Sequence, residues 1–220
     1  MKKLSAEISA LYRNRFEEAH DAVRRRLMSE VCRKVLSRYM PDRGVIFDAG
    51  CGKGEFINSC RGRRRYALDM NADNREYLES DVSFMVGSIV DIPCSSSMAD
   101  VVFSSNLLEH LNSKEELMGA LREMGRILRP GGVMILIGPN IRYVYREYWD
   151  YFDHHIPLSH LSLVEALGLV GLTPVRVVPR FLPYTIKSRL PKGGIFIDLY
   201  LSLPPLWRIF GRQFLIIARK

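Results

Sequence analysis

Residues 45–56 of the chain read Val45-Ile46-Phe47-Asp48-Ala49-Gly50-Cys51-Gly52-Lys53-Gly54-Glu55-Phe56. An apolar run ends in an acid and is followed by three glycines, with one residue between each pair. Glycines at this spacing let the backbone turn sharply and approach a ligand that a Cβ atom would push away. The Gly-x-Gly-x-Gly pattern differs from the Gly-x-Gly-x-x-Gly pattern of dinucleotide-binding folds. The turn therefore disfavours a nicotinamide oxidoreductase.

A second carboxylate ends the next apolar run, which reads Tyr66-Ala67-Leu68-Asp69. The separation between the glycine turn and Asp69 fits one strand–turn–helix–strand unit. A carboxylate at that strand end can accept hydrogen bonds from both hydroxyls of a ribose. Together, the turn and the acid predict a site for a nucleoside that carries no diphosphate.

Apolar runs alternate with amphipathic segments along most of the chain. The predicted strands are residues 44–48, 65–69, 83–86, 100–104, 133–138, 174–179 and 213–218. The predicted helices are residues 53–61, 73–79, 114–128 and one that begins near Ser162, whose hydroxyl can cap it. Continuous apolar strands between amphipathic helices indicate a parallel sheet covered on both faces. Right-handed crossovers then predict a doubly wound α/β sheet.

The N-terminal part of the chain precedes this alternation. Residues 5–39 carry apolar positions at helical spacing, and Pro41-Asp42 ends the pattern. Residues 1–41 are therefore predicted to form an N-terminal helical segment that leads into one α/β domain, residues 42–220.

Composition narrows the remaining possibilities. The formal net charge is +8, and 47% of the residues are apolar, which is ordinary for a soluble globular domain. The four cysteines form no Cys-x-x-Cys pair, so a zinc knuckle or disulfide framework is not indicated and a reducing compartment is expected. No apolar run approaches the ~18 residues of a membrane helix, and a charge comes too early for a signal peptide. We therefore expect a cytoplasmic protein.

Strand ends should gather the polar residues at one edge of the sheet, where open α/β sheets bind their ligands. Turn amides there can hold the carboxylate of an amino-acid group. Met70 and Ile89 are placed to sandwich a purine, and Ser88 to meet its edge. The predicted cofactor-binding residues are Asp48, Gly50, Cys51, Gly52, Gly54, Asp69, Met70, Ser88, Ile89, Ser105 and Asn106.

Four motifs in this order resemble the class I S-adenosylmethionine-dependent methyltransferases. They are Asp48-Ala49-Gly50-Cys51-Gly52-Lys53-Gly54, Asp69, Ser104-Ser105-Asn106-Leu107-Leu108-Glu109-His110-Leu111 and Leu128-Arg129-Pro130-Gly131-Gly132. The resemblance implies S-adenosylmethionine as the cofactor and a Rossmann-like sheet of seven strands, the last antiparallel and inserted beside the fifth. Ser88 is a departure, because many relatives carry an aspartate there. The segment from Asn140 to Tyr184 resembles a bacterial, small-molecule methyltransferase-like subgroup whose acceptor is unassigned.

Two segments break the strand–helix pattern and are predicted to form acceptor-side loop or lid elements, residues 139–160 and 180–211. The second is an unusually long insertion before the last strand, and its four prolines argue against one long amphipathic helix. Three interpretations stay open for it: an acceptor lid, a dimer arm and an interfacial contact with a membrane.

Three histidines are the candidate catalytic residues: His110, His154 and His155. His110 follows the fourth predicted strand, and a neutral imidazole suits general-base work near pH 7. A packing role for His110 stays open. No metal site is predicted, because the side chains of adjacent histidines diverge and the spacing is weak for zinc.

The predicted function is methyl transfer from S-adenosylmethionine to a small-molecule, sugar or lipid-linked acceptor, at oxygen. One alternative is a cofactor-binding protein without catalysis. An aminopropyltransferase would want extra acids after Ser104, where only Glu109 occurs. A nucleic-acid methyltransferase is motivated by the charge, but no Asn/Asp-Pro-Pro-Tyr-like motif follows the fourth strand, so no nucleic-acid partner is expected.

Overall fold

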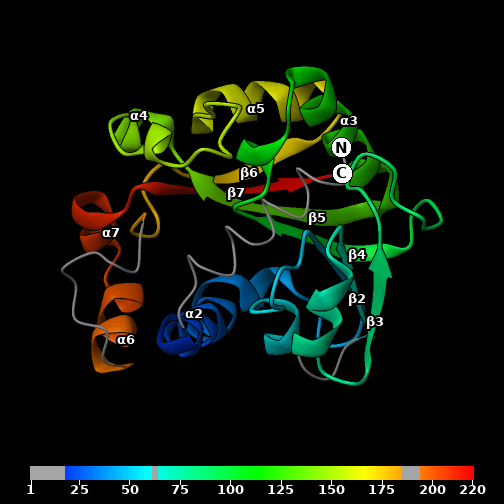
Figure 1. Ribbon diagram of the computed structural model, residues 1–220, viewed down its shortest axis with the longest axis horizontal. Coiled ribbons are helices and arrows are strands. Elements are labelled where there is room, and N and C mark those ends of the chain that lie inside the picture. Colours follow the sequence, from blue (N-terminus) through cyan, green and yellow to red (C-terminus); the bar gives the residue numbers. More distant parts are fainter. Residues whose placement is uncertain (1–17, 61–63, 185–193) are drawn as a thin grey trace.

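A seven-stranded sheet forms the centre of the protein (Figure 1). The computed structural model describes residues 18–60, 64–184 and 194–220. The strand order is β3-β2-β1-β4-β5-β7-β6, with β7 antiparallel to both neighbours and the remaining pairs parallel. The strands are β1 (Val45–Ala49), β2 (Arg64–Asp69), β3 (Val82–Val86), β4 (Ala99–Ser105), β5 (Leu128–Pro139), β6 (Thr173–Val178) and β7 (Gln213–Arg219). The predicted doubly wound sheet and its antiparallel last strand are confirmed.

Helices cover both faces of the sheet (Figure 1). One face carries α2 (Glu18–Val31), α6 (Gly194–Ser202) and α7 (Pro204–Phe210), and the other carries α3 (Lys114–Ile127) and α5 (His160–Leu169). Shorter helices are α4 (Ile141–Val144), the π-helix η1 (Cys32–Leu36) and the 3₁₀ turns η2 (Ser37–Tyr39), η3 (Ile57–Ser59), η4 (Ala72–Tyr77), η5 (Leu108–His110) and η6 (Tyr148–Asp150). Among the described residues, no helix is long and apolar enough to span a bilayer.

Strand β7 is apolar along most of its length because helices cover the sheet on both faces. Along β7, Leu215 and Ile217 enter the core beneath α2, α6 and α7, whereas Phe214 and Ile216 enter the core beneath α3 and α5. Successive side chains of a strand point to opposite faces, so a strand buried on both sides must be apolar throughout.

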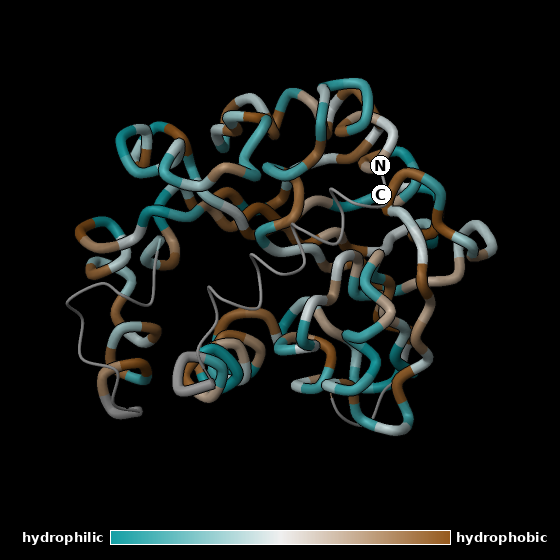
Figure 2. The backbone as a smooth tube through the Cα atoms, in the orientation of Figure 1, coloured by the Kyte–Doolittle hydropathy of each residue, from teal (hydrophilic) through white to brown (hydrophobic). Residues whose placement is uncertain are grey.

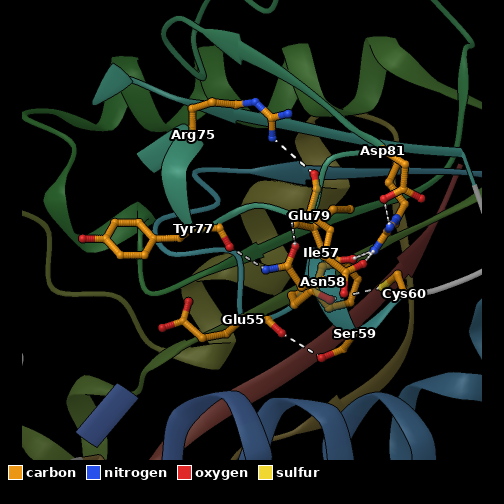
Figure 3. Close-up of polar contacts among 11 residues, drawn as sticks. Glu55, Ile57, Asn58, Ser59, Cys60, Arg75, Tyr77, Glu79 and Asp81 are labelled. Atoms are coloured by element: carbon orange, nitrogen blue, oxygen red, sulfur yellow. Dashed lines mark hydrogen bonds and ion pairs between the residues drawn. The ribbon is translucent and has the colours of Figure 1, made fainter. Parts of the chain in front are cut away.

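The predicted helices at residues 53–61 and 73–79 are wrong, because only the short turns η3 and η4 form there. The side chain of Asn58 ties the first segment to the backbone of the second instead (Figure 3). Asn58 Nδ2 donates to the Tyr77 carbonyl at 2.8 Å, and Glu79 N–H donates to Asn58 Oδ1 at 3.1 Å. The buried guanidinium of Arg65 donates to the Ile57 carbonyl at 3.2 Å and to Glu79 at 2.7 Å. Such bonds give the backbone an alternative to helical pairing.

Two other predictions are refined. Helix α5 begins one turn earlier than expected, because Ser159 caps it and exchanges hydrogen bonds with Ser162. The long insertion contains α6 and α7, and Pro204 opens α7, where a missing N–H costs nothing. Residues 1–17 of the N-terminal segment and residues 185–193 of the insertion lie outside the described residues.

We expect Asn58→Ala to lower the free energy of unfolding by about 1–2 kcal/mol, because two backbone groups lose their partner. Urea unfolding followed by circular dichroism measures the loss. Asn74→Ala is the matched control, since the Asn74 side chain makes no hydrogen bond with the part of the chain that the structure describes. Equal losses in both variants would contradict the bridging role of Asn58.

Candidate functional site

The glycine turn follows β1 and is built from left-handed residues. Gly50, Gly52 and Gly54 have φ values of +76°, +50° and +72°, a region that other residues rarely adopt. A Cβ atom at Gly50 would overlap Leu107, and one at Gly54 would overlap Leu78, whereas nothing lies within 4 Å of a Cβ at Gly52. Gly52 therefore borders open space that a ligand can fill.

The carboxylate of Asp69 holds the turns after β1 and β2 together. Its Oδ2 accepts from Gly52 N–H at 2.9 Å, and its Oδ1 accepts from Asn71 N–H at 2.9 Å. The Leu68 carbonyl also accepts from the amides of Gly50 and Cys51, at 2.8 and 3.0 Å. One acid is thereby fixed at the edge of the sheet between both turns.

Asp48 lies beneath this turn and is buried. Burial raises its pKa well above the usual range, and the carboxylates of Glu55 and Asp69 raise it further. Burial likewise raises the pKa of the Cys51 thiol, which makes it a poor nucleophile.

The turn is also tied to helix α2. Lys53 Nζ lies 2.5 Å from Asp21 Oδ2, and Arg24 Nε lies 3.3 Å from Glu55 Oε1. The start of α2 therefore packs beside the glycine turn, a contact that the sequence did not predict.

The remaining predicted cofactor residues lie at or just beyond the ends of β2, β3 and β4. Met70 is 75% exposed, whereas Ile89 is 6% exposed and packs in the core. That these two side chains sandwich a purine stays a prediction. The Ser88 hydroxyl accepts from Val90 N–H at 3.4 Å. Asn106 adopts a φ of +50°, and its Nδ2 donates to Ser105 Oγ at 3.0 Å.

His110 stands at the end of η5 with its tautomer set by the backbone. Its Nδ1 lies 2.8 Å from the Asp153 carbonyl oxygen, which can only accept a hydrogen bond. Nδ1 must therefore carry the proton, and Nε2 is left as the basic nitrogen. Nε2 lies 3.9 Å from Glu109 Oε1.

Glu109, the neighbour of His110 in the chain, is hydrogen-bonded to the segment that follows η6. Burial raises the pKa of Glu109, against a smaller lowering by His110. Its backbone carbonyl accepts from the amides of His155 and Ile156, at 2.8 and 3.1 Å. His154 is thereby brought beside His110, with ring centroids 4.9 Å apart, while the His155 side chain is exposed. Two of the three predicted histidines come together.

The same cluster has atoms that suit a metal ion. Ligand atoms of Glu109, His110 and His154 lie within 4.8 Å of one another. A carboxylate with two imidazoles is a donor set used by zinc and iron. The prediction that the chain holds no metal stays a prediction.

Aromatic rings surround the two histidines. Tyr151 stacks on His154 at 5.0 Å, and Tyr184 meets Tyr151 edge-on at 5.6 Å. The Tyr184 hydroxyl is buried without a hydrogen-bond partner among the described residues, and burial raises its pKa. Sequence reasoning missed Tyr184 because no local pattern marks it; pairing of the preceding Leu182 and Pro183 with Gln213 brings it here.

Comparisons with known proteins agree with this arrangement. A family model described as a methyltransferase domain matches residues 47–136, from β1 into β5. The malonyl-[acyl-carrier protein] O-methyltransferase of Yersinia pestis is 33% identical over 150 residues, which cover 62% of this chain and 55% of that one. The chain spans about half the length of the first curated relatives that it matches.

Solved structures show the same fold. A SAM-dependent methyltransferase of Archaeoglobus fulgidus has a TM-score of 0.67 at 22% identity, covering 89% of this chain and 94% of that one. A Haloferax volcanii methyltransferase in complex with the Trm112 activator has a TM-score of 0.67 at 21% identity, covering 86% of this chain and 88% of that one.

The sheet order and the glycine turn define a Rossmann-like α/β protein, and sheets of this class bind their ligands at the carboxyl ends of the strands. Residues 47–136, which match the methyltransferase-domain model, include the glycine turn, Asp69 and His110, and the chain shares the fold of the solved SAM-dependent methyltransferase of Archaeoglobus fulgidus.

We expect Asp48→Asn to stabilise the cofactor-free protein increasingly as pH rises. The folded-state pKa of Asp48 is raised, so the wild type loses stability as pH climbs from the unfolded-state pKa towards the folded-state pKa. The asparagine variant avoids this loss. Thermal unfolding from pH 4 to pH 8 measures the difference in Tm, at about 2–4 °C for each kcal/mol. A Tm difference independent of pH would contradict a buried, titrating carboxyl.

Proposed function

We propose that this chain transfers the methyl group of S-adenosylmethionine to an oxygen atom of a small-molecule, sugar or lipid-linked acceptor. The observation that carries the proposal is the 2.8 Å contact between His110 Nδ1 and the Asp153 carbonyl oxygen, which leaves Nε2 available as a base. The relative named as an O-methyltransferase supports oxygen as the target.

The residues at the edge fit the cofactor. Open space beside Gly52 leaves room for the close approach of its amino-acid part, and the Asp69 carboxylate can accept from the ribose hydroxyls. Met70 offers an exposed apolar side chain to the adenine. When bound, the cofactor supplies a methyl group already activated by its sulfonium, so the protein mainly has to position the acceptor.

His110 has the chemistry to activate that acceptor. With the cofactor bound, Nε2 would take the proton of an acceptor hydroxyl as the oxygen bonds to the methyl carbon; the carbon–sulfur bond would break, and the sulfur would leave as a neutral thioether. The Asp153 carbonyl holds the imidazole in the required tautomer and so acts as a positioning group. A positioned base of this kind contributes about 10²–10⁴-fold to a rate.

The aromatic rings indicate a small or flat acceptor group. Tyr151 and Tyr184 present ring surfaces near His154, and the buried Tyr184 hydroxyl is placed to hydrogen-bond a polar atom of the acceptor. A buried hydroxyl without a partner is costly, which favours a ligand that satisfies it.

Incubation of a cell extract with isotopically labelled methyl donor, followed by mass spectrometry, tests the function. A labelled small molecule that carries the methyl on oxygen is expected. Labelled RNA or DNA would assign a nucleic-acid acceptor, and cofactor binding without any labelled product would assign a binding protein.

Gly52→Ala should weaken the binding of S-adenosylmethionine at least tenfold by calorimetry, because its Cβ enters the space proposed for the cofactor. Gly131→Ala is a matched control. Gly131 lies near the amino end of β5, away from the glycine turn, and has a φ of +76° and no atom within 4 Å of a Cβ at that position. Both variants carry backbone strain of about 1–2 kcal/mol. Equal cofactor affinity in the two would contradict the proposed binding site.

His110→Gln should lower kcat by about 10²–10⁴-fold, because the proposed base is lost. Cofactor affinity and Tm should stay at their wild-type values, because His110 is proposed to act on the acceptor. Wild-type kcat in this variant would assign His110 a packing role.

Incubation with EDTA separates base catalysis from metal chemistry at the same cluster. We expect an unchanged rate of methyl transfer. A rate that falls with EDTA and returns with Zn²⁺ would assign Glu109, His110 and His154 to a metal.

A further inference from the structure

A pocket lies at the end of α2 that is farther from the glycine turn. It has a volume of about 450 Å³ and lies among η1, η2, β6 and the turn between α6 and α7. Trp207 and Leu201 contribute apolar walls. Its charged lining residues are all basic: Arg33, Lys34, Arg38 and Arg176.

The basic residues are only partly neutralised by acids. Arg33 Nη2 lies 2.5 Å from Glu30, and Lys34 Nζ lies 2.5 Å from Asp198. Within residues 18–60, 64–184 and 194–220, Arg38 and Arg176 form no ion pair, and the buried Arg176 Nη1 has no hydrogen-bond partner. A buried guanidinium nitrogen with no acceptor is expensive unless an anion supplies one.

The pocket is separate from the cofactor site. Asp21, near the start of α2, pairs with Lys53 of the glycine turn, whereas Arg33 and Lys34 follow the end of that helix. Twelve helical residues separate these positions by about 18 Å. The pocket therefore calls for a ligand of its own.

Exposed apolar side chains flank the pocket on α6 and α7. Ile197, Tyr200 and Trp207 bury one side of the helix pair. The exposed large apolar residues of the pair are Phe196, Leu199, Leu203, Ile209 and Phe210. Figure 2 shows hydrophobic colouring on both helices, at the edge of the molecule. Scattered apolar residues on a surface are ordinary, but five on two adjoining helices indicate an interaction surface.

We propose that α6, α7 and this pocket dock the protein on a bilayer that contains anionic phospholipids. The pocket takes the phosphate of a lipid headgroup, and the exposed side chains enter the boundary with the acyl chains. Charge and apolar surface occur together here, and a lipid presents both partners at once. A nucleic acid would match the cations but leave the five apolar side chains in water.

Vesicle sedimentation with the full chain tests the proposal. The protein should sediment with vesicles of phosphatidylcholine and phosphatidylglycerol and stay in solution with phosphatidylcholine alone. Arg38→Gln with Arg176→Gln should weaken partitioning about fivefold per arginine. The matched control, Arg75→Gln with Arg122→Gln, removes the same charge outside the pocket and should bind as the wild type does.

A second pair of variants tests the apolar part. Phe196→Ser with Ile209→Ser should reduce partitioning about tenfold or more. Leu161→Ser with Leu169→Ser, on the exposed side of α5 across the sheet, should leave it unchanged. Wild-type Tm in each variant confirms that the fold is intact.

Three results would overturn membrane docking. The first is a wild-type protein that binds neither vesicle. The second is inorganic phosphate that raises Tm only when Arg38 and Arg176 are present, without vesicle binding, which would assign a soluble phosphate compound. The third is salt-sensitive binding to random RNA, without vesicle binding, that the same arginine variants abolish.

Discussion

The carboxylate of Asp69 sets the geometry of the two turns that follow β1 and β2. It accepts one amide from the glycine turn and one from the turn after β2, so both turns are fixed relative to a single acid. Hydrogen bonds to a charged acceptor are stronger than neutral ones. They let three glycines in left-handed conformations form a defined loop instead of a mobile one. The hydrogen bond from Gly52 N–H to Asp69 also fixes the orientation of Gly52. In that orientation its Cα borders open space.

The surroundings of His110 are organised by Glu109 in a comparable way. Its backbone carbonyl accepts two amides from the segment after α4, and this pairing carries His154 to the ring of His110. The carboxyl group is buried, and burial disfavours its ionised form. Burial of Asp48 has the same consequence beneath the glycine turn. Both carboxyls reduce stability at neutral pH, a cost that proteins commonly accept at functional sites.

Sequence reasoning succeeded where one local pattern controls the structure. Each strand was predicted to within a few residues except β5, which begins five residues early. The almost wholly buried strands β1, β4 and β7 were readable because a strand buried on both faces is apolar along its length. The helix predicted at residues 53–61 failed because Asn58 bonds to backbone groups about twenty residues away, and propensity contains no information about that contact. Burial of Ile89 and the position of Tyr184 depend on tertiary packing in the same way.

The position of β7 between β5 and β6 orders the events of folding during synthesis. Strands β1 to β5 pair with one another and carry the glycine turn, Asp69 and His110, so the half of the sheet that holds these residues can assemble as soon as β5 has left the ribosome. Strand β6 pairs only with β7, which is made about 35 residues later. Until then the edge of β5 lacks its neighbour, and that exposed edge is where a nascent chain is most prone to pair with another molecule.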